Sequence, residues 1–185
     1  MAPRDEIYTR IAFKGLGIYN ICVAEDSTIV NKSPYKKICE QLGELLDSRE
    51  FSDIELKCGE KVFNCHQVIL SAGSPVFKAM FQTDMEEKKT KVVTIREMEP
   101  EVLAQMVYFM YTGESNEQNF TREMAKDLYE AADRYQVAIL KIKCEENIYL
   151  DLRAENAIDT LMFADLYQSD RLKEAAMKLI VRNEQ

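Results

Sequence analysis

The chain has 185 residues, of which 46% are hydrophobic and 30% are charged, a balance that is ordinary for a globular domain. Its formal net charge of −8 disfavours nucleic acid as a partner, because non-specific phosphate binding requires clustered lysines and arginines. No apolar run has the length that crosses a bilayer, and the first residues lack the apolar core of a secretory signal. We therefore expect no membrane partner and a location in the nucleus, the cytoplasm or both.

The five cysteines stand at positions 22, 39, 58, 65 and 144, and no two of them form a C-x-x-C pair. An odd number without such a pair predicts reduced thiols that pack as small apolar groups. The sequence therefore indicates neither a disulfide framework nor a structural zinc site.

Residues 7–30 alternate between apolar and polar side chains in short pieces, as in Ile18–Val23. This pattern predicts short strands, interrupted by Gly15 and Gly17.

A helix is predicted after the linker 31–34, because Ile38, Leu42 and Leu45 fall at i, i+4 and i+7 and share one face. Leu46 widens this apolar stripe. Most amphipathic helices use such a stripe to cover their own core, and an interface between two subunits is the other reading.

The segment from Phe51 to Gly113 opens with strands. Ile54, Leu56 and Cys58 alternate with charged residues, which predicts a half-buried strand, and Gly59-Glu60 supplies a hairpin turn into a second strand. A third strand is predicted at Val92–Ile95.

The remaining elements are predicted to be helices. Ser74-Pro75 is a start signal, since serine can cap free amides and proline suits the first turn. Pro100 opens another helix that Gly113 ends in a left-handed conformation. The same apolar spacing continues to the C-terminus, with a last helix pair over 152–184 that breaks at 168–170. The inward-facing residues are Leu103, Met106, Val107, Met110, Met124, Leu128, Ala131, Ala132, Tyr135, Leu140, Cys144, Ile148, Leu161, Ala164, Leu172, Ala176 and Leu179.

Cys65, His66 and Asp53 are the residue types of a nucleophile, a base and a carboxylate in a hydrolase triad. Cys65 and His66 are adjacent at a predicted strand end, so their side chains point to opposite faces and cannot share a proton. We interpret His66, the only histidine, and Asp53 as hydrogen-bonded structural residues. A cysteine hydrolase would require an unusually reactive Cys65.

One set of residues stands in a characteristic order: Phe51–Ile54, Phe63–Leu70, Ser74–Phe77, Met80-Phe81 and Tyr111–Gly113. In this set the chain resembles a BTB/POZ domain. A second set follows, Asp133–Tyr135, Leu140-Lys141, Cys144-Glu145 and Glu155–Ala157. With these residues the chain is similar to the speckle-type POZ proteins within that family, and the likeness runs from Ile38 onward.

The resemblance implies a mixed α/β (α+β) BTB/POZ fold, a small sheet flanked by a helical cluster with a C-terminal helix pair known as the 3-box. Residues 1–33 then correspond to the last strands of a MATH domain and a linker, with most of that domain absent. Residues 34–150 form the BTB/POZ domain and residues 151–185 the 3-box. At the start of the 3-box, Arg153 stands where relatives often have a capping serine, so Asp151 is expected to cap instead.

The resemblance also implies a non-catalytic protein-interaction module without a cofactor. In speckle-type POZ proteins the leucines that match Ile38, Leu42 and Leu45 form the homodimer seam. BTB proteins that recruit cullin-3 carry a loop with a hydrophobic residue, any residue and a glutamate, which here is Met85-Glu86-Glu87. Without the surrounding pattern, that loop would be read as a solvated charged turn with an incidental methionine.

Two hypotheses follow from the resemblance. The leading one is a substrate adaptor of a cullin-3 ubiquitin ligase that forms homodimers and docks the cullin through Met85 and Glu87, with Tyr111 near the cullin-facing side. A truncated chain could instead regulate by pairing with full-length MATH-BTB relatives. The alternative is a BTB assembly module of transcriptional or scaffolding complexes without cullin.

Overall fold

The structure is a computed structural model and describes residues 8–11, 19–22, 34–82, 90–115 and 120–183. The chain forms two compact units, Met1–Gln41 and Leu42–Gln185. In the first unit, β1 (Tyr8–Ile11) pairs antiparallel with β2 (Tyr19–Cys22), with Tyr8 opposite Cys22. These are short strands within the range where the alternation predicts them.

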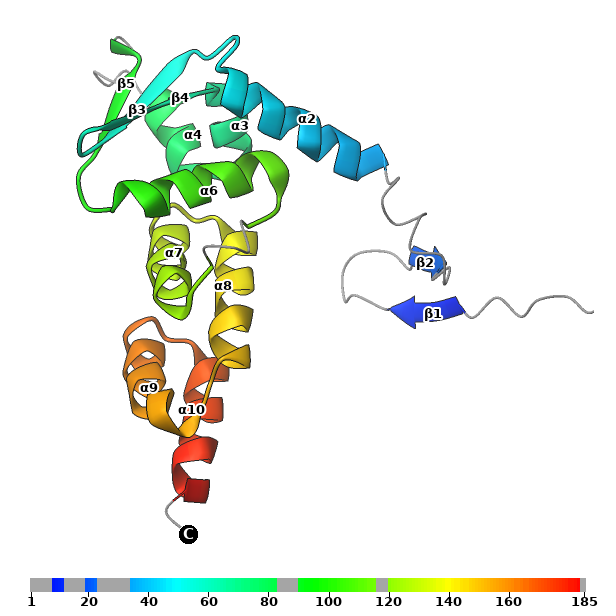
Figure 1. Ribbon diagram of the computed structural model, residues 1–185, viewed down its shortest axis with the longest axis vertical. Coiled ribbons are helices and arrows are strands. Elements are labelled where there is room, and N and C mark those ends of the chain that lie inside the picture. The colour runs from blue at the N-terminus through cyan, green and yellow to red at the C-terminus, as the bar shows by residue number, and fades with distance from the viewer. Residues whose placement is uncertain (1–7, 12–18, 23–33, 83–89, 116–119, 184–185) are drawn as a thin grey trace, which may run out of the picture. The chain divides into compact units, whose positions relative to one another are not determined.

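The second unit contains a three-stranded sheet of β3 (Ile54–Cys58), β4 (Lys61–Cys65) and β5 (Val92–Ile95), in the order β4-β3-β5 (Figure 1). β3 and β4 form the predicted hairpin, because Gly59 adopts a positive φ of 56° and brings Cys58 opposite Lys61. β5 runs parallel to β3 at the edge opposite β4, so the chain must cross over β3 between β4 and β5.

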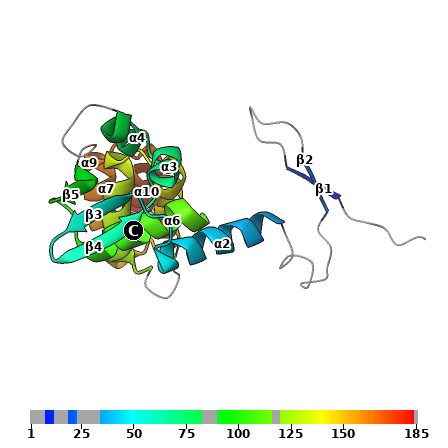
Figure 2. The same ribbon diagram turned by 90° about the horizontal axis from the view of Figure 1, so that it is seen from above.

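The crossover begins with α3 (Gln67–Gly73) and α4 (Pro75–Gln82), which lie side by side (Figures 1 and 2). Ser74 joins the two helices. Its hydroxyl accepts a hydrogen bond from the Phe77 amide at 3.2 Å and donates one to the Tyr135 carbonyl at 2.6 Å. The predicted cap is thus confirmed, and it also ties α4 to the end of α7 (Arg122–Arg134).

Helices make up the remainder of this unit. α2 (Pro34–Ser48) begins in the first unit and ends in the second. α6 is followed by the neighbours α7 and α8, then by a short 3₁₀ turn and the neighbours α9 and α10 (Figure 1). Their bounds are α6 Pro100–Thr112, α7 Arg122–Arg134, α8 Ala138–Leu150, η2 Ala154–Asn156, α9 Ala157–Leu166 and α10 Asp170–Asn183. Gly113 ends α6 with φ 70°, as predicted. No helix in the described ranges combines the length and apolar character that crossing a membrane requires.

One hydrophobic cluster runs from the sheet to the last helix pair. It includes Leu56 of β3, Leu103 of α6, Leu140 of α8, Ala164 of α9 and Leu172 of α10, all fully buried. The C-terminal helices α9 and α10 therefore share one hydrophobic core with the sheet and with the helices that precede them. Burial of this cluster supplies most of the folding free energy of the unit.

The expectation for Asp151 is wrong. Asp151 is the residue that ends α8, and its backbone N–H donates to the carbonyls of that helix. The side chain of Asn156 closes the following turn instead, accepting from the Arg153 amide and donating to the Asp151 carbonyl, both at 2.8 Å. The Asp151 carboxylate turns towards Arg122, 3.7 Å away.

Candidate functional site

His66 lies at the junction of β4 and α3, where it is buried and fully hydrogen-bonded. Its backbone N–H donates to the Tyr111 hydroxyl at 2.8 Å, and its Nδ1 lies 2.7 Å from the same hydroxyl. Nε2 lies 2.7 Å from the Glu50 carbonyl oxygen, which can only accept, so Nε2 carries the proton and Nδ1 accepts from Tyr111. The prediction that His66 is a hydrogen-bonded residue is confirmed.

Asp53 has an equally structural environment. Its Oδ1 accepts from the Gln67 amide at 2.7 Å, and Oδ2 accepts from the Gln67 side chain at 3.1 Å. The carboxylate thus satisfies an amide at the start of α3, which has no partner within the helix.

The cysteines with described side chains, Cys39, Cys58, Cys65 and Cys144, are free. Burial raises the pKa of Cys65 to about 12, so at neutral pH its thiol stays protonated and is a poor nucleophile. Cys144 has its pKa raised to about 12 for the same reason. In the described part of the chain, no group of three or more histidine, cysteine or acidic side chains is placed to hold a metal ion.

Tyr111 is buried in its own subunit, with 2% of its surface exposed. Burial raises the pKa of its phenol, and the hydroxyl is occupied by His66. The side chain therefore holds the end of α6 against the β4–α3 junction and is not available at the surface.

Met85 and Glu87 lie outside the described residues. The elements on either side are described, since α4 ends at Gln82 and β5 begins at Val92.

The predicted stripe of α2 divides between two environments. Ile38, in the first unit, is 53% exposed. Leu42 and Leu46 are half-buried and pack against the core of the second unit, while Leu45 is half-buried outside that cluster. Leu42 therefore serves its own core in part, which leaves Ile38 and Leu45 as the members of the stripe with the least internal role.

An apolar surface on α9 was missed by the sequence analysis. Ile158, Met162 and Leu166 are 66%, 69% and 73% exposed and fall at i, i+4 and i+8, so they line one face, here named the α9 stripe. The i, i+4, i+8 spacing of these three residues was the sequence signal that could have indicated this face. The opposite face, with Ala157 and Ala164, is buried.

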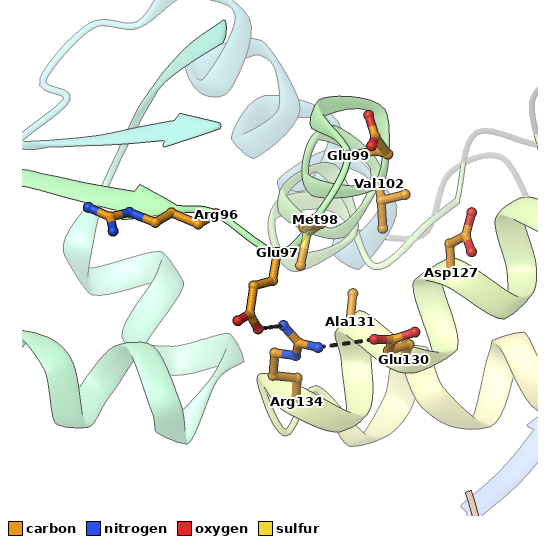
Figure 3. Close-up of a pocket in the computed structure, with 9 residues that line it drawn as sticks. All are labelled: Arg96, Glu97, Met98, Glu99, Val102, Asp127, Glu130, Ala131 and Arg134. Atoms are coloured by element: carbon orange, nitrogen blue, oxygen red, sulfur yellow. Dashed lines mark hydrogen bonds and ion pairs between the residues drawn. The ribbon is translucent and has the colours of Figure 1, made fainter. Parts of the chain in front are cut away.

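A cleft of about 360 Å³ lies between the β5–α6 connection and α7 (Figure 3). Arg134 donates across it to Glu97 and, along its own helix, to Glu130. Burial raises the pKa of Asp127, which also lines the cleft, and the neighbouring carboxylates add to that effect. Because Arg134 is already paired with two carboxylates of its own chain, we assign no ligand to this cleft.

Comparison with known proteins identifies the family. The family model of the BTB/POZ domain matches residues 42–151. The chain belongs to the BTB/POZ family. The BTB domain of zebrafish PATZ1 is a similar solved structure, with 24% identity and a TM-score of 0.52 over 64% of this chain and 97% of that one. This likeness shows the fold, so the predicted mixed α+β BTB fold is confirmed.

Membership in the BTB/POZ family indicates a function in binding other proteins. BTB domains are in general non-enzymatic protein-interaction modules, and they typically self-associate. The exposed apolar surfaces of this BTB protein are therefore its candidate functional sites.

Proposed function

We propose that this BTB protein is a homodimeric adaptor that binds cullin-3 in a cullin-RING ubiquitin ligase, and that it belongs to the speckle-type POZ subgroup. The observation that carries the proposal is the α9 stripe. It stands on a helix pair that follows the family-matched region and shares its core, which is where the resemblance implies a 3-box.

The α9 stripe has the properties of a docking surface. Full burial of a Leu, Ile or Met side chain contributes about 1.5–3 kcal/mol, and roughly two thirds of each stripe residue is still in contact with water. Covering all three would contribute about 3–6 kcal/mol before the cost of association, which is comparable to a small interface hot spot. A monomer gains nothing from leaving these side chains exposed.

The sequence motif Met85-Glu86-Glu87 supports the same partner. A methionine beside acidic residues can fill an apolar pocket on a partner while Glu87 adds electrostatic steering and a polar rim. We assign Tyr111 no direct contact, because it is buried; its role is to hold α6 in place.

The homodimer is proposed to form through α2, with Ile38 and Leu45 meeting their counterparts and Leu42 supporting them from the core. A symmetric contact uses each side chain twice, which doubles its contribution. The same surface would allow heterodimers with full-length MATH-BTB relatives.

We further assign residues 1–33 to the end of a MATH domain and its linker, residues 34–150 to the BTB/POZ domain and residues 151–185 to the 3-box. An adaptor of this kind would act in the nucleus, the cytoplasm or both.

The cullin proposal is tested by mixing the chain with the N-terminal region of cullin-3 and measuring co-elution and affinity. Wild type should co-elute, and Met162→Asp and Met85→Asp should weaken the affinity at least about tenfold. Ile139→Asp is the matched control, because Ile139 of α8 is 67% exposed, like Met162, and lies off the stripe. Wild type that never co-elutes would remove the proposal.

A BTB assembly module without cullin is the second candidate, and the surface of α8 favours it. Ile139, Ile142 and Leu150 are exposed there, and the cullin proposal does not use them. Under this alternative, the dimer forms normally, wild type does not bind cullin-3, and Ile142→Asp disrupts assembly with another protein.

The dimer is tested by light scattering. Ile38→Asp is the cleanest variant, because Ile38 is exposed and the new charge disturbs no internal packing. It should give a folded monomer. Lys37→Asp, an exposed change on the same helix but off the stripe, should leave the dimer intact. Leu42→Asp is expected to damage the fold as well, since Leu42 packs against the core.

A further inference from the structure

Arg122 is the first residue of α7, and its side chain is only 11% exposed. A guanidinium in such a position must be compensated by acceptors, because an unpaired buried charge is strongly destabilising. Its Nη2 donates to Thr160 Oγ1 at 2.7 Å, to Asp159 Oδ2 at 3.1 Å and to the Asn156 carbonyl at 3.4 Å. Nη1 makes no hydrogen bond and lies 3.7 Å from an Asp151 carboxylate oxygen.

These acceptors belong to one continuous stretch of chain, from the end of α8 into the first turns of α9. Lys126, one turn further along α7, adds a second cation to Asp159 and lies 5.4 Å from the centre of the Phe163 ring. Asp159 stands in the first turn of α9, where a carboxylate also interacts favourably with the helix dipole. Arg122 and Lys126 of α7 thus both bind the first turn of α9.

Uncharged contacts also attach α9. Tyr129 of α7 contacts Phe163 and Tyr167 edge-on, with ring centres 5.2 and 5.5 Å apart, and Ala164 belongs to the shared core. Ring contacts of this kind resist separation but tolerate small rotations, since several tilts have similar energies. Hydrogen bonds from a guanidinium are directional and fix a rotation.

We propose that Arg122 is a positioning residue that sets the rotation of α9 and thereby the direction in which the α9 stripe faces. Ile158 precedes Asp159, and Met162 follows Thr160 by two residues, so the stripe begins at the turn that Arg122 holds. This inference rests on the proposed function for the identity of the partner. Its structural part concerns the orientation of α9 alone.

Lysine cannot replace this arginine. The guanidinium reaches Asp151 with one nitrogen and Thr160 and Asp159 with the other, whereas an ammonium is a single point charge on a flexible stem. Arg122→Lys therefore keeps the charge and loses the geometry. Arg122→Met keeps much of the volume of the aliphatic stem but loses both the charge and the hydrogen-bond geometry.

The matched control is Arg134→Met. Arg134 lies at the other end of α7, is 41% exposed and also pairs with two carboxylates, Glu97 and Glu130. In the described part of the chain, its hydrogen bonds go to Glu97 and Glu130 and to no residue of α9 or of the turn before it. Burial raises the pKa of Tyr167 at the end of α9, and the charge of Arg134 opposes that rise from a distance. Any general effect of removing a paired arginine from α7 should appear in this variant too.

The experiment measures three quantities for each variant: affinity for the cullin-3 N-terminal region, hydrogen exchange of the α9 amides relative to those of α6, and the melting temperature. Arg122→Met and Arg122→Lys should bind about tenfold more weakly than wild type and exchange α9 amides about tenfold faster, with exchange in α6 unchanged. Arg134→Met should match wild type in both. Wild-type affinity and wild-type α9 exchange in Arg122→Met would overturn the inference, and so would full rescue by Arg122→Lys.

If wild type does not bind cullin-3, the proposed function fails, and α9 exchange alone judges the inference: faster exchange in Arg122→Met supports it, and unchanged exchange overturns it. If Arg122→Met does not fold, Thr160→Val takes its place, because it removes the acceptor of the 2.7 Å bond and keeps the shape of a fully buried side chain. Faster α9 exchange in Thr160→Val then supports the inference, and wild-type exchange overturns it.

Discussion

Replacing Tyr111 by phenylalanine removes one oxygen and leaves the ring in place. In the wild type this oxygen lies 2.8 Å from the His66 amide nitrogen and 2.7 Å from His66 Nδ1, and both contacts are buried. The variant leaves a buried N–H donor and an imidazole acceptor without a partner. An unsatisfied buried group costs about 1–3 kcal/mol, and the phenol no longer has to be desolvated, so we expect a net loss of about 2 kcal/mol.

Urea and thermal unfolding measure this loss. For a chain of this length, about 2 kcal/mol corresponds to a melting temperature lower by about 4–8 °C. Tyr108→Phe is the control on the same helix, because the Tyr108 hydroxyl makes no hydrogen bond to the described residues, and its effect should stay within about 0.5 kcal/mol.

Nitrogen NMR gives a second readout, since His66 is the only histidine and supplies a single imidazole signal set. Wild type should show Nδ1 as an accepting nitrogen and Nε2 as the protonated one. Tyr111→Phe should keep Nε2 protonated, because the Glu50 carbonyl still accepts from it, and should shift the Nδ1 signal, because Nδ1 has lost its donor. A variant that melts with wild type and leaves the Nδ1 signal unchanged would refute the reasoning.

Three further predictions concern single groups. At a pKa of about 12, only about one Cys65 thiol in 10⁵ is ionised at pH 7, so iodoacetamide should label Cys39 well before Cys65 in the native protein, as followed by mass spectrometry; fast labelling of Cys65 would contradict its burial. Gly113→Ala should lower the unfolding free energy in urea by about 1–2 kcal/mol, since φ is 70° and no atom lies within 4 Å of an added Cβ; a much larger loss would indicate a steric clash. The hydrogen bond from Lys126 is the main cause that lowers the pKa of Asp159 below 3.8. The ionised Asp159 carboxylate therefore stabilises the fold fully above pH 3.8, and this stabilisation disappears as the pH falls through the lowered pKa of the folded protein. Wild type should lose slightly more stability on acidification than Asp159→Asn. Equal acid sensitivity of the two proteins would show that the pair contributes nothing.

The strands and helix boundaries that depend on neighbouring residues could be predicted from the sequence. The alternation at Ile54, Leu56 and Cys58 predicts which strand residues are buried, and the structure buries all three. Ser74 and Gly113 mark helix boundaries because their side-chain chemistry suits those positions. Each of these predictions needs only neighbouring residues.

Contacts between residues far apart in the chain could not be predicted from the sequence in the same way. Arg122 and Thr160 are 38 positions apart, and nothing periodic links them. The α9 stripe was missed for another reason: α9 is apolar on two faces, so its sequence does not tell which face turns inward. The capping prediction for Asp151 was wrong because the end of α8 and the carboxylate's attraction to Arg122 decide its role.

The residues that look catalytic are those that hold the junction of β4 and α3. Asp53 accepts a hydrogen bond from the Gln67 amide, and both ring nitrogens of His66 are hydrogen-bonded. The Tyr111 hydroxyl bonds to His66 twice, at the backbone N–H and at Nδ1. Substitutions here should act through the folding free energy, because every polar group is engaged within the subunit. Substitutions in the α9 stripe should change affinity with little effect on melting, because those side chains face water. Plotting melting temperature against cullin-3 affinity should therefore separate the two sets, and a Met162→Asp variant that loses stability as much as Tyr111→Phe would place the stripe inside the fold instead of at an interface.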